Sequence, residues 1–353
     1  MRTAGLIAVS VVLAGVYAGA AAAVATPSAA QGGTAATGQL PPHPRSARTH
    51  RGAAARARAA HSKRRKARRA QPASAVAPND PLWSREWGPQ AVGLPAVWAH
   101  PAATRSVVVA VIDTGVDPTQ PDLSGRVLPG WNELTGTADT DDDNGHGTAV
   151  AGVVAARTGN ALGTAGYCRT CSILPVKVLD ASGHGSSTTI AAGIDWSVAH
   201  GADIINLSLT LTTRDPTVSA AVARALAAGV IVVAAAGNGG DTTVNYPAGE
   251  PGVVSVAADD PSGALYAWST SGDWVTVAAP GCNLTTSLGG GFGEFCGTSS
   301  AAAALSGILG TVLGRSTAPA AVIEQDLAAT ADRSTRRVDA LALVAALAQS
   351  AVR

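Results

Sequence analysis

Residues 106–117 read SVVVAVIDTGVD, and this stretch gives the clearest indication of the fold. Its first seven residues form a nearly continuous apolar run, which is typical of a strand buried on both faces of a parallel sheet. The run ends at Asp113, and Thr114 and Gly115 follow. Because functional residues of open α/β sheets lie beyond the carboxyl ends of the strands, Asp113 is a candidate for such a residue.

The sequence that follows repeats this pattern. Similar apolar runs occupy residues 172–178, 204–209, 230–235, 253–258 and 274–278. Alanine-rich stretches of helical composition separate several of them, at residues 146–156, 187–200, 218–228 and 299–313. This alternation predicts an α/β fold of the doubly wound type, with a mostly parallel central sheet and helices on both faces.

The chain divides into a basic segment and an acidic domain. Of its 25 Lys and Arg residues, 11 lie between Arg45 and Arg69, whereas no Asp or Glu precedes Asp80. Residues 80–353 carry 13 basic and 24 acidic side chains, a formal net charge of −11, and we expect them to form one globular domain. Residues 26–79 contain no aromatic side chain, so we expect a basic, disordered prosegment or linker there.

The N-terminus has the features of a secretory signal. Arg2 precedes an apolar run that covers residues 4–25 and ends in Ala-Val-Ala. We therefore expect residues 1–25 to be a signal peptide and the protein to be secreted. An uncleaved membrane anchor is the alternative, because the run is close to the length that spans a bilayer.

Four cysteines fit an oxidising compartment. They allow three connectivities, of which we favour the two local pairs, Cys168–Cys171 and Cys282–Cys296. A redox dithiol or half a zinc site are other readings of the C-x-x-C pair, but no further ligand or thioredoxin-like context lies near it.

Three further motifs carry residue types that chemistry uses together. Residues 144–148 read NGHGT and residues 297–302 read GTSSAA, and each begins an alanine-rich stretch. Asn238 follows the apolar run at 230–235. A serine hydroxyl becomes nucleophilic when an imidazole takes its proton, and a carboxylate orients that imidazole. Ser299, His146 and Asp113 supply these groups, and the Asn238 amide suits an oxyanion.

In their order and spacing, these motifs resemble those of the subtilisin-like (subtilase) family of serine endopeptidases, and in particular its secreted, thermitase-type branch. The likeness covers nearly all of residues 79–353. It implies that Asp113 orients His146, that His146 acts as base and then acid, and that Ser299 attacks the peptide bond. It also implies an oxyanion hole formed by Asn238 and the Ser299 backbone N–H, with an acyl-enzyme intermediate and no catalytic cofactor.

The resemblance further implies a pocket for the substrate side chain before the cleaved bond. One wall is Ser208, Leu209 and Thr210, the other is Ala235, Ala236 and Gly237, and Asn245 lies near the base. No carboxylate occupies these positions, so we expect broad specificity with neutral or apolar side chains there. Asp241 and Glu250 lie close enough in sequence to weaken this expectation.

The family often carries structural calcium, which prefers mixed carboxylate, amide and carbonyl oxygens. By resemblance, Asp80, Asp122 and Asn160 match ligands of one site. The acidic run at 139–143 matches the place of a second site, with Asp139 and Asp143 as its ligands. Exposed carboxylates screened by solvent are the alternative for both.

Two rival functions remain open at this stage. A catalytically inactive, peptide-binding relative would fit Thr210, which replaces the family's usual glycine, and the lack of a foldable prosegment. A surface-attached protein that binds calcium or a polyanion is the other. We expect protein or peptide substrates as partners, no nucleic acid, a membrane only if residues 1–25 stay attached, and a monomer.

Overall fold

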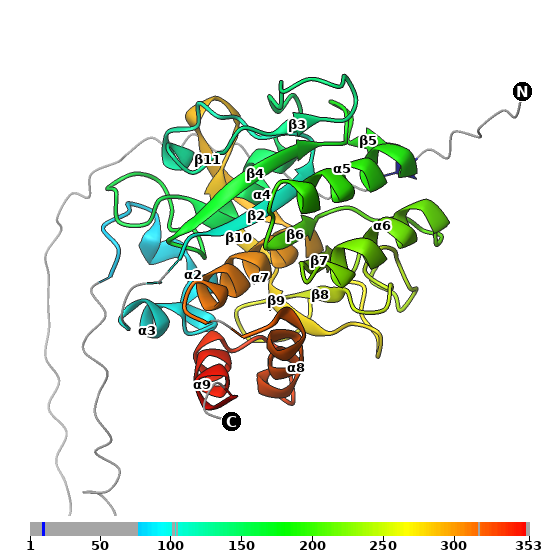
Figure 1. The fold of residues 1–353 in the computed structure, drawn as a ribbon. Helices are drawn as coiled ribbons and strands as arrows, with labels where there is room; N and C mark the ends of the chain where they lie inside the picture. Colours follow the sequence, from blue (N-terminus) through cyan, green and yellow to red (C-terminus); the bar gives the residue numbers. More distant parts are fainter. Residues whose placement is uncertain (1–8, 11–76, 101–102, 104, 317, 351–353) are drawn as a thin grey trace, which may run out of the picture. The chain divides into compact units, whose positions relative to one another are not determined.

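A seven-stranded parallel sheet forms the centre of the protein (Figure 1). The computed structural model describes residues 9–10, 77–100, 103, 105–316 and 318–350. The strand order is β3-β4-β2-β6-β7-β8-β9, and every neighbouring pair runs parallel. The strands are β2 (Val107–Asp113), β3 (Trp131–Asn132), β4 (Cys171–Lys177), β6 (Ile204–Leu207), β7 (Ile231–Ala235), β8 (Val254–Asp259) and β9 (Val277–Pro280).

The predicted α/β architecture is confirmed. Five of the six apolar runs become strands whose starts lie within one residue of the expected ones, because such runs are buried on both faces. The last strand, β9, begins at Val277, three residues later than expected. The short edge strand β3 was not expected, and its two residues give too little periodicity to detect.

Helices cover both faces of the sheet (Figure 1). On one face, α5 (Ser187–Ala199) and α6 (Pro216–Ala227) pack on side chains such as Ile112 and Val232. On the other face, α4 (His146–Ala155) and α7 (Thr298–Leu313) pack on Val109 and Val233. Helix α7 is buried almost all round, which explains its continuous run of small and aliphatic residues.

The remaining elements lie at the borders of this core. They are β1 (Val9–Ser10) paired with β5 (His184–Gly185), the hairpin β10 (Cys282–Thr286) and β11 (Phe292–Cys296), and the helices α2 (Trp87–Ala91), α3 (Leu94–Trp98), α8 (Ala320–Thr330) and α9 (Ala340–Ser350). Single-turn helices occur at Trp83–Arg85, Pro121–Leu123 and Leu288–Gly290. In the described part of the chain, no helix has the length and apolar character needed to cross a bilayer.

The expected signal peptide and basic segment lie outside the described residues, apart from Val9–Ser10 and residues 77–79. The domain boundaries at residues 25 and 79 therefore stay predictions. Both expected disulfides are present: Cys168–Cys171 at the start of β4, and Cys282–Cys296 across the β10–β11 hairpin.

Candidate active site

A buried pair of side chains, Asp113 and His146, lies at the carboxyl ends of the strands. Asp113 ends β2 and is 0% exposed, whereas His146 is the first residue of α4 and is 7% exposed. Their contact joins Asp113 Oδ1 to His146 Nδ1 over 2.7 Å. Because Nδ1 faces the carboxylate, Nε2 is the nitrogen left to exchange a proton with a substrate or a nucleophile.

Hydrogen bonds around Thr114 hold this pair in place. The Thr114 N–H donates to the same Asp113 Oδ1 over 2.7 Å. The Thr114 hydroxyl donates to Asp142 Oδ1 at 2.8 Å and accepts the N–H of Gly147 at 3.0 Å. The turn after β2 and the first turn of α4 are therefore joined through one side chain.

The surroundings of His146 favour its protonated form. Burial alone would lower the pKa of the imidazole, but the Asp113 carboxylate, its hydrogen bond and Asp142 outweigh it, so the pKa is raised. The Phe295 ring packs edge-on against the imidazole, with ring centroids 5.2 Å apart. A base with a raised pKa can accept a proton from a hydroxyl during a reaction.

Ser299 and Asn238 lie together at the start of α7. Asn238 Oδ1 accepts the Thr298 N–H over 2.9 Å and the Thr298 hydroxyl over 3.0 Å, so the amide nitrogen is free to point elsewhere. A Cβ added to Gly297 would lie 3.6 Å from Asn238 Nδ2 and 3.7 Å from the Ser299 nitrogen. Two N–H donors thus border the same space, and glycine, with its φ of 144°, leaves that space open.

The Ser299 hydroxyl donates to the Ser208 carbonyl over 3.1 Å in this structure. No hydrogen bond joins Ser299 to His146 among the residues described. A hydrogen bond from the Ser299 hydroxyl to His146 would require the hydroxyl to leave the Ser208 carbonyl, and such bonds often form only when a ligand is bound.

The residues expected to form the pocket walls lie at the ends of two neighbouring strands: Ser208–Thr210 follow β6, and Ala235–Gly237 begin with the last residue of β7. Ser208 and Leu209 are buried, whereas Thr210 is partly exposed. On the other side, Ala235, Ala236 and Gly237 are all buried. Main-chain bonds join Leu211, just after the first wall, to Tyr246, next to Asn245. The walls therefore offer mainly backbone groups.

Asn245, predicted to lie near the base of the pocket, contacts the second wall. Its Nδ2 donates to the Ala236 carbonyl over 2.8 Å. A Cβ on Gly237 would come within 2.4 Å of the same nitrogen, so only glycine fits there. The Asn245 side chain thus fixes the backbone of this wall at Ala236 and packs directly against Gly237.

Glu250 and Asp241, the carboxylates close in sequence to the expected pocket, both have partners within the protein. Glu250 is buried and forms a two-pronged ion pair with Arg214, at 2.9 and 2.6 Å, and also accepts from Ser219. Burial raises the pKa of Glu250, but Arg214 and Ser219 more than offset it, so the pKa is lowered. Asp241 is exposed and caps the turn at Thr243.

The structure brings Asp80, Asp122 and Asn160 together. Asp80 accepts the backbone N–H groups of Gly159 and Asn160, and the Asn160 amide donates to Asp122 Oδ1 over 2.7 Å. Burial and, to a smaller extent, Asp80 raise the pKa of Asp122. Such a buried negative set suits calcium, with the amide turned to present its oxygen. Within the described ranges, no group of three His, Cys, Asp or Glu side chains forms a metal site.

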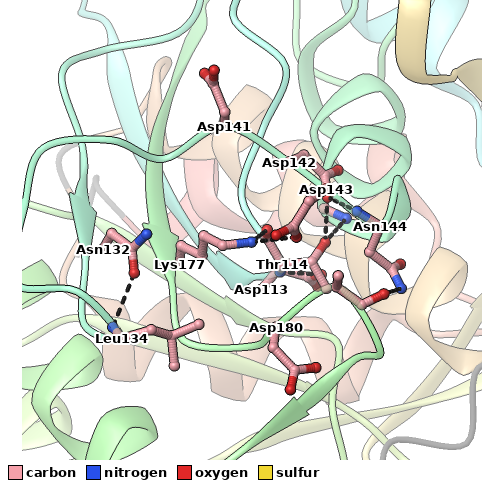
Figure 2. Close-up of polar contacts among 12 residues, drawn as sticks. Asp113, Thr114, Asn132, Leu134, Asp141, Asp142, Asp143, Asn144, Lys177 and Asp180 are labelled. Atoms are coloured by element: carbon pink, nitrogen blue, oxygen red, sulfur yellow. Dashed lines mark hydrogen bonds and ion pairs between the residues drawn. The ribbon is translucent and has the colours of Figure 1, made fainter.

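The side chains of the acidic run at 139–143 have separate partners, and Figure 2 shows Asp141 pointing away from Asp142 and Asp143. Asp142 points inward and accepts the N–H groups of Asn144, Gly145 and Thr148, so it caps α4. Asp143 pairs with Lys177 over 2.6 Å, whereas Asp139 accepts the Asp141 N–H. The expected second calcium ligands therefore have separate partners, and the arrangement lends the second site no support.

Sequence reasoning missed several residues of the site. Thr114, Asp142 and Lys177 connect the loops that carry Asp113 and His146, and Thr298 orients Asn238. The only available signal was position, because Thr114 and Thr298 each adjoin a predicted site residue. Nothing local in the sequence indicated that Asp142 would turn inward.

Comparison with known proteins shows the family to which the chain belongs. Residues 104–341 match the subtilase family. The chain is 40% identical over 235 residues to thermitase from Thermoactinomyces vulgaris, covering 66% of this chain and 84% of thermitase. It is 39% identical over 237 residues to a thermophilic serine proteinase from Bacillus sp. (strain AK1), covering 67% of this chain but 59% of that protein. A solved protease structure from Pseudoalteromonas arctica PAMC 21717 superposes with a TM-score of 0.71 at 31% identity, covering 77% of this chain and 100% of that one.

Proposed function

This chain belongs to the subtilase family and is a serine endopeptidase, and we propose that it cleaves peptide bonds through Asp113, His146 and Ser299. The observation that carries the proposal is the buried 2.7 Å contact between Asp113 Oδ1 and His146 Nδ1. This contact fixes the tautomer in which His146 Nε2 accepts a proton. The start of α7 presents Ser299 on the same edge of the sheet.

In this proposal Ser299 Oγ attacks the carbonyl carbon while His146 takes the hydroxyl proton. Asp113 stabilises the imidazolium that forms and remains ionised. His146 then donates the proton to the leaving amine, and the acyl group stays on Ser299. Water, activated by the same imidazole, releases the acyl group and regenerates the hydroxyl.

The negative charge on the carbonyl oxygen forms between two donors, Asn238 Nδ2 and the Ser299 N–H. The Asn238 amide is held before the reaction, because Thr298 binds its oxygen, and the Ser299 N–H belongs to the backbone at the start of α7. Donors that need no rearrangement at the moment of attack lower the barrier most. Removing the corresponding amide in subtilisin costs about 10²–10³ in turnover.

The pocket between Ser208–Thr210 and Ala235–Gly237 is proposed to take a neutral or apolar side chain. Buried Glu250 is neutralised by Arg214, so it offers no free charge to a basic substrate side chain. The backbone of the first wall would pair with an extended substrate. Kinetics with a peptide series that varies only this side chain test the preference, and a dominant preference for arginine or lysine would contradict it.

We further propose that the enzyme is secreted and holds one structural calcium at Asp80, Asp122 and Asn160. Two disulfides in the described residues favour an oxidising compartment. Calcium would offset the negative charge of the buried carboxylates and brace the loop around Gly159. A chelator should then lower the melting temperature of the protein but not that of an Asp122→Ala variant.

Labelling with a fluorophosphonate tests the proposed nucleophile. The wild-type protein should be labelled once, and Ser299→Ala should not be labelled at all. Ser262→Ala, which removes an exposed hydroxyl far from Ser299 in sequence, is the matched control and should label like the wild type. A folded wild-type protein that stays unlabelled would indicate a peptide-binding relative without turnover.

A further inference from the structure

Lys177 is a buried cation that contacts both loops of the site. It is the last residue of β4 and lies in register with Asp113 on the neighbouring strand. Its side chain is 6% exposed, and its Nζ donates to the Thr114 carbonyl and, over 2.6 Å, to Asp143 Oδ1 (Figure 2). It is also the only lysine after residue 66.

Both contacts lie close to the Asp113–His146 pair along the chain. Thr114 follows Asp113 directly, and its N–H donates to the carboxylate oxygen that His146 contacts. Asp143 lies three residues before His146, in the loop that leads into α4. One ammonium group therefore fixes the turn after the carboxylate and the loop before the imidazole.

The buried Lys177 ammonium group is expected to fix the positions of its neighbours rather than to add much to the stability of the fold. An ammonium group loses hydration when buried, and ion pairs in such positions are often no more stabilising than apolar side chains of similar size. The Asp143 carboxylate is 54% exposed, so solvent weakens its attraction to Lys177 further. What the ammonium supplies, and an apolar side chain does not, is a fixed direction for the Thr114 carbonyl and for Asp143.

We propose that Lys177 is a positioning residue, which holds the Asp113–Thr114 turn and the 139–144 loop in the arrangement that lets Asp113 orient His146. This inference rests on the triad proposed above. Lys177 touches neither substrate nor the reacting atoms, and it transfers no proton. Its loss should slow the chemical step while substrate binding stays nearly unchanged, because neither contact of Lys177 involves a residue of the proposed pocket.

The test is a comparison of kcat and KM on a peptide amide substrate. Lys177→Met removes the charge and keeps the length, and we expect kcat to fall about tenfold to hundredfold, as for small misplacements of catalytic groups, with KM changed by less than about twofold. Lys177→Arg keeps a cation and should restore most of kcat. Arg224→Met, which breaks the exposed pair with Asp195, is the matched control and should behave like the wild type.

Several results would overturn the proposal. The proposal fails if Lys177→Met keeps the kcat of the wild type. It also fails if Lys177→Met and Lys177→Arg lose kcat equally, because the positive charge would then be irrelevant. If Lys177→Met does not fold, Asp143→Asn breaks the same ion pair at an exposed carboxylate, and unchanged kcat there would also contradict it. Ser299→Ala is assayed in parallel: full activity in that variant refutes the triad itself, whereas an unaffected Lys177→Met refutes only the positioning role.

Discussion

Glu86 should make the stability of the protein depend on pH. Glu86 is 4% exposed, and its carboxylate accepts the Ala165 N–H with both oxygens, at 3.0 and 3.1 Å. Burial raises the pKa of Glu86 from 4.5 to about 8, and the nearby Asp80 and Asp122 carboxylates add to the effect. The substitution Glu86→Gln keeps the shape and one acceptor oxygen but removes the titration.

The sign and size follow from proton linkage. Between pH 4.5 and 8 the unfolded chain has lost the Glu86 proton while the folded chain keeps it. Folding therefore binds a proton, and the free energy of unfolding falls by about 1.4 kcal/mol per pH unit as the pH rises. Between pH 6 and pH 9, the free energy of unfolding falls only over the two pH units below the folded-state pKa of about 8. Titration of Glu86 should therefore lower it by about 3 kcal/mol.

Urea unfolding at pH 6 and pH 9 measures this difference. A Ser299→Ala background prevents self-digestion, and a chelator keeps cations away from Asp80 and Asp122. The Glu86→Gln variant should lose about 3 kcal/mol less than its parent between the two pH values, whereas Glu294→Gln, at an exposed carboxylate, should follow the parent. Equal pH dependence in the parent and Glu86→Gln would refute the argument.

Three other substitutions test separate features. Arg337→Met should lower the free energy of unfolding by about 3–5 kcal/mol, because the substitution leaves the fully buried Asp259 carboxylate without its 2.6 Å ion pair. Chemical denaturation measures this loss, and a value under about 1 kcal/mol would contradict the prediction. Asp113→Asn should lower kcat by a factor of about 10⁴. It should also move the acid limb of the pH profile of kcat/KM to lower pH, because the Asp113 carboxylate raises the pKa of His146. An unchanged acid limb would show that the carboxylate does not raise this pKa. Replacing Cys282 and Cys296 together by serine should cost about 3 kcal/mol, because the bridge closes a loop of this length in the unfolded chain, and unchanged urea midpoints would show that the hairpin needs no bridge.

The central sheet was predictable because burial on both faces leaves a clear mark on the sequence. The run that becomes β2 needs apolar side chains at every position, so its composition alone indicates a strand. The hairpin of β10 and β11 leaves no such mark, since residues such as Asn283 and Thr285 are polar and find partners only in the folded protein. Buried polar side chains satisfied by distant residues are invisible to patterns of hydrophobicity.

The residues of the proposed triad could be singled out from the sequence for a different reason. Asp113, His146 and Ser299 each adjoin the end of a strand or the start of a helix, where glycines and small residues make a recognisable local motif. Their mutual arrangement depends on contacts between segments far apart in the chain. Thr114 meets Asp142 across 28 residues and Lys177 across 63, and no local pattern encodes either contact.

The acidic run at 139–143 shows why charge density alone does not identify a cation site. Adjacent carboxylates in a loop can bind a metal ion, but they can equally well accept hydrogen bonds from main-chain N–H groups. The fold decides between these uses, because the start of α4 offers Asp142 several unpaired N–H donors and the end of β4 offers Asp143 an ammonium group. By contrast, Asp80 and Asp122 come from separate segments, both are buried, and Asn160 links them by giving its backbone N–H to Asp80 and its side-chain amide to Asp122. An external cation is therefore expected where distant carboxylates converge, and not where neighbouring ones diverge.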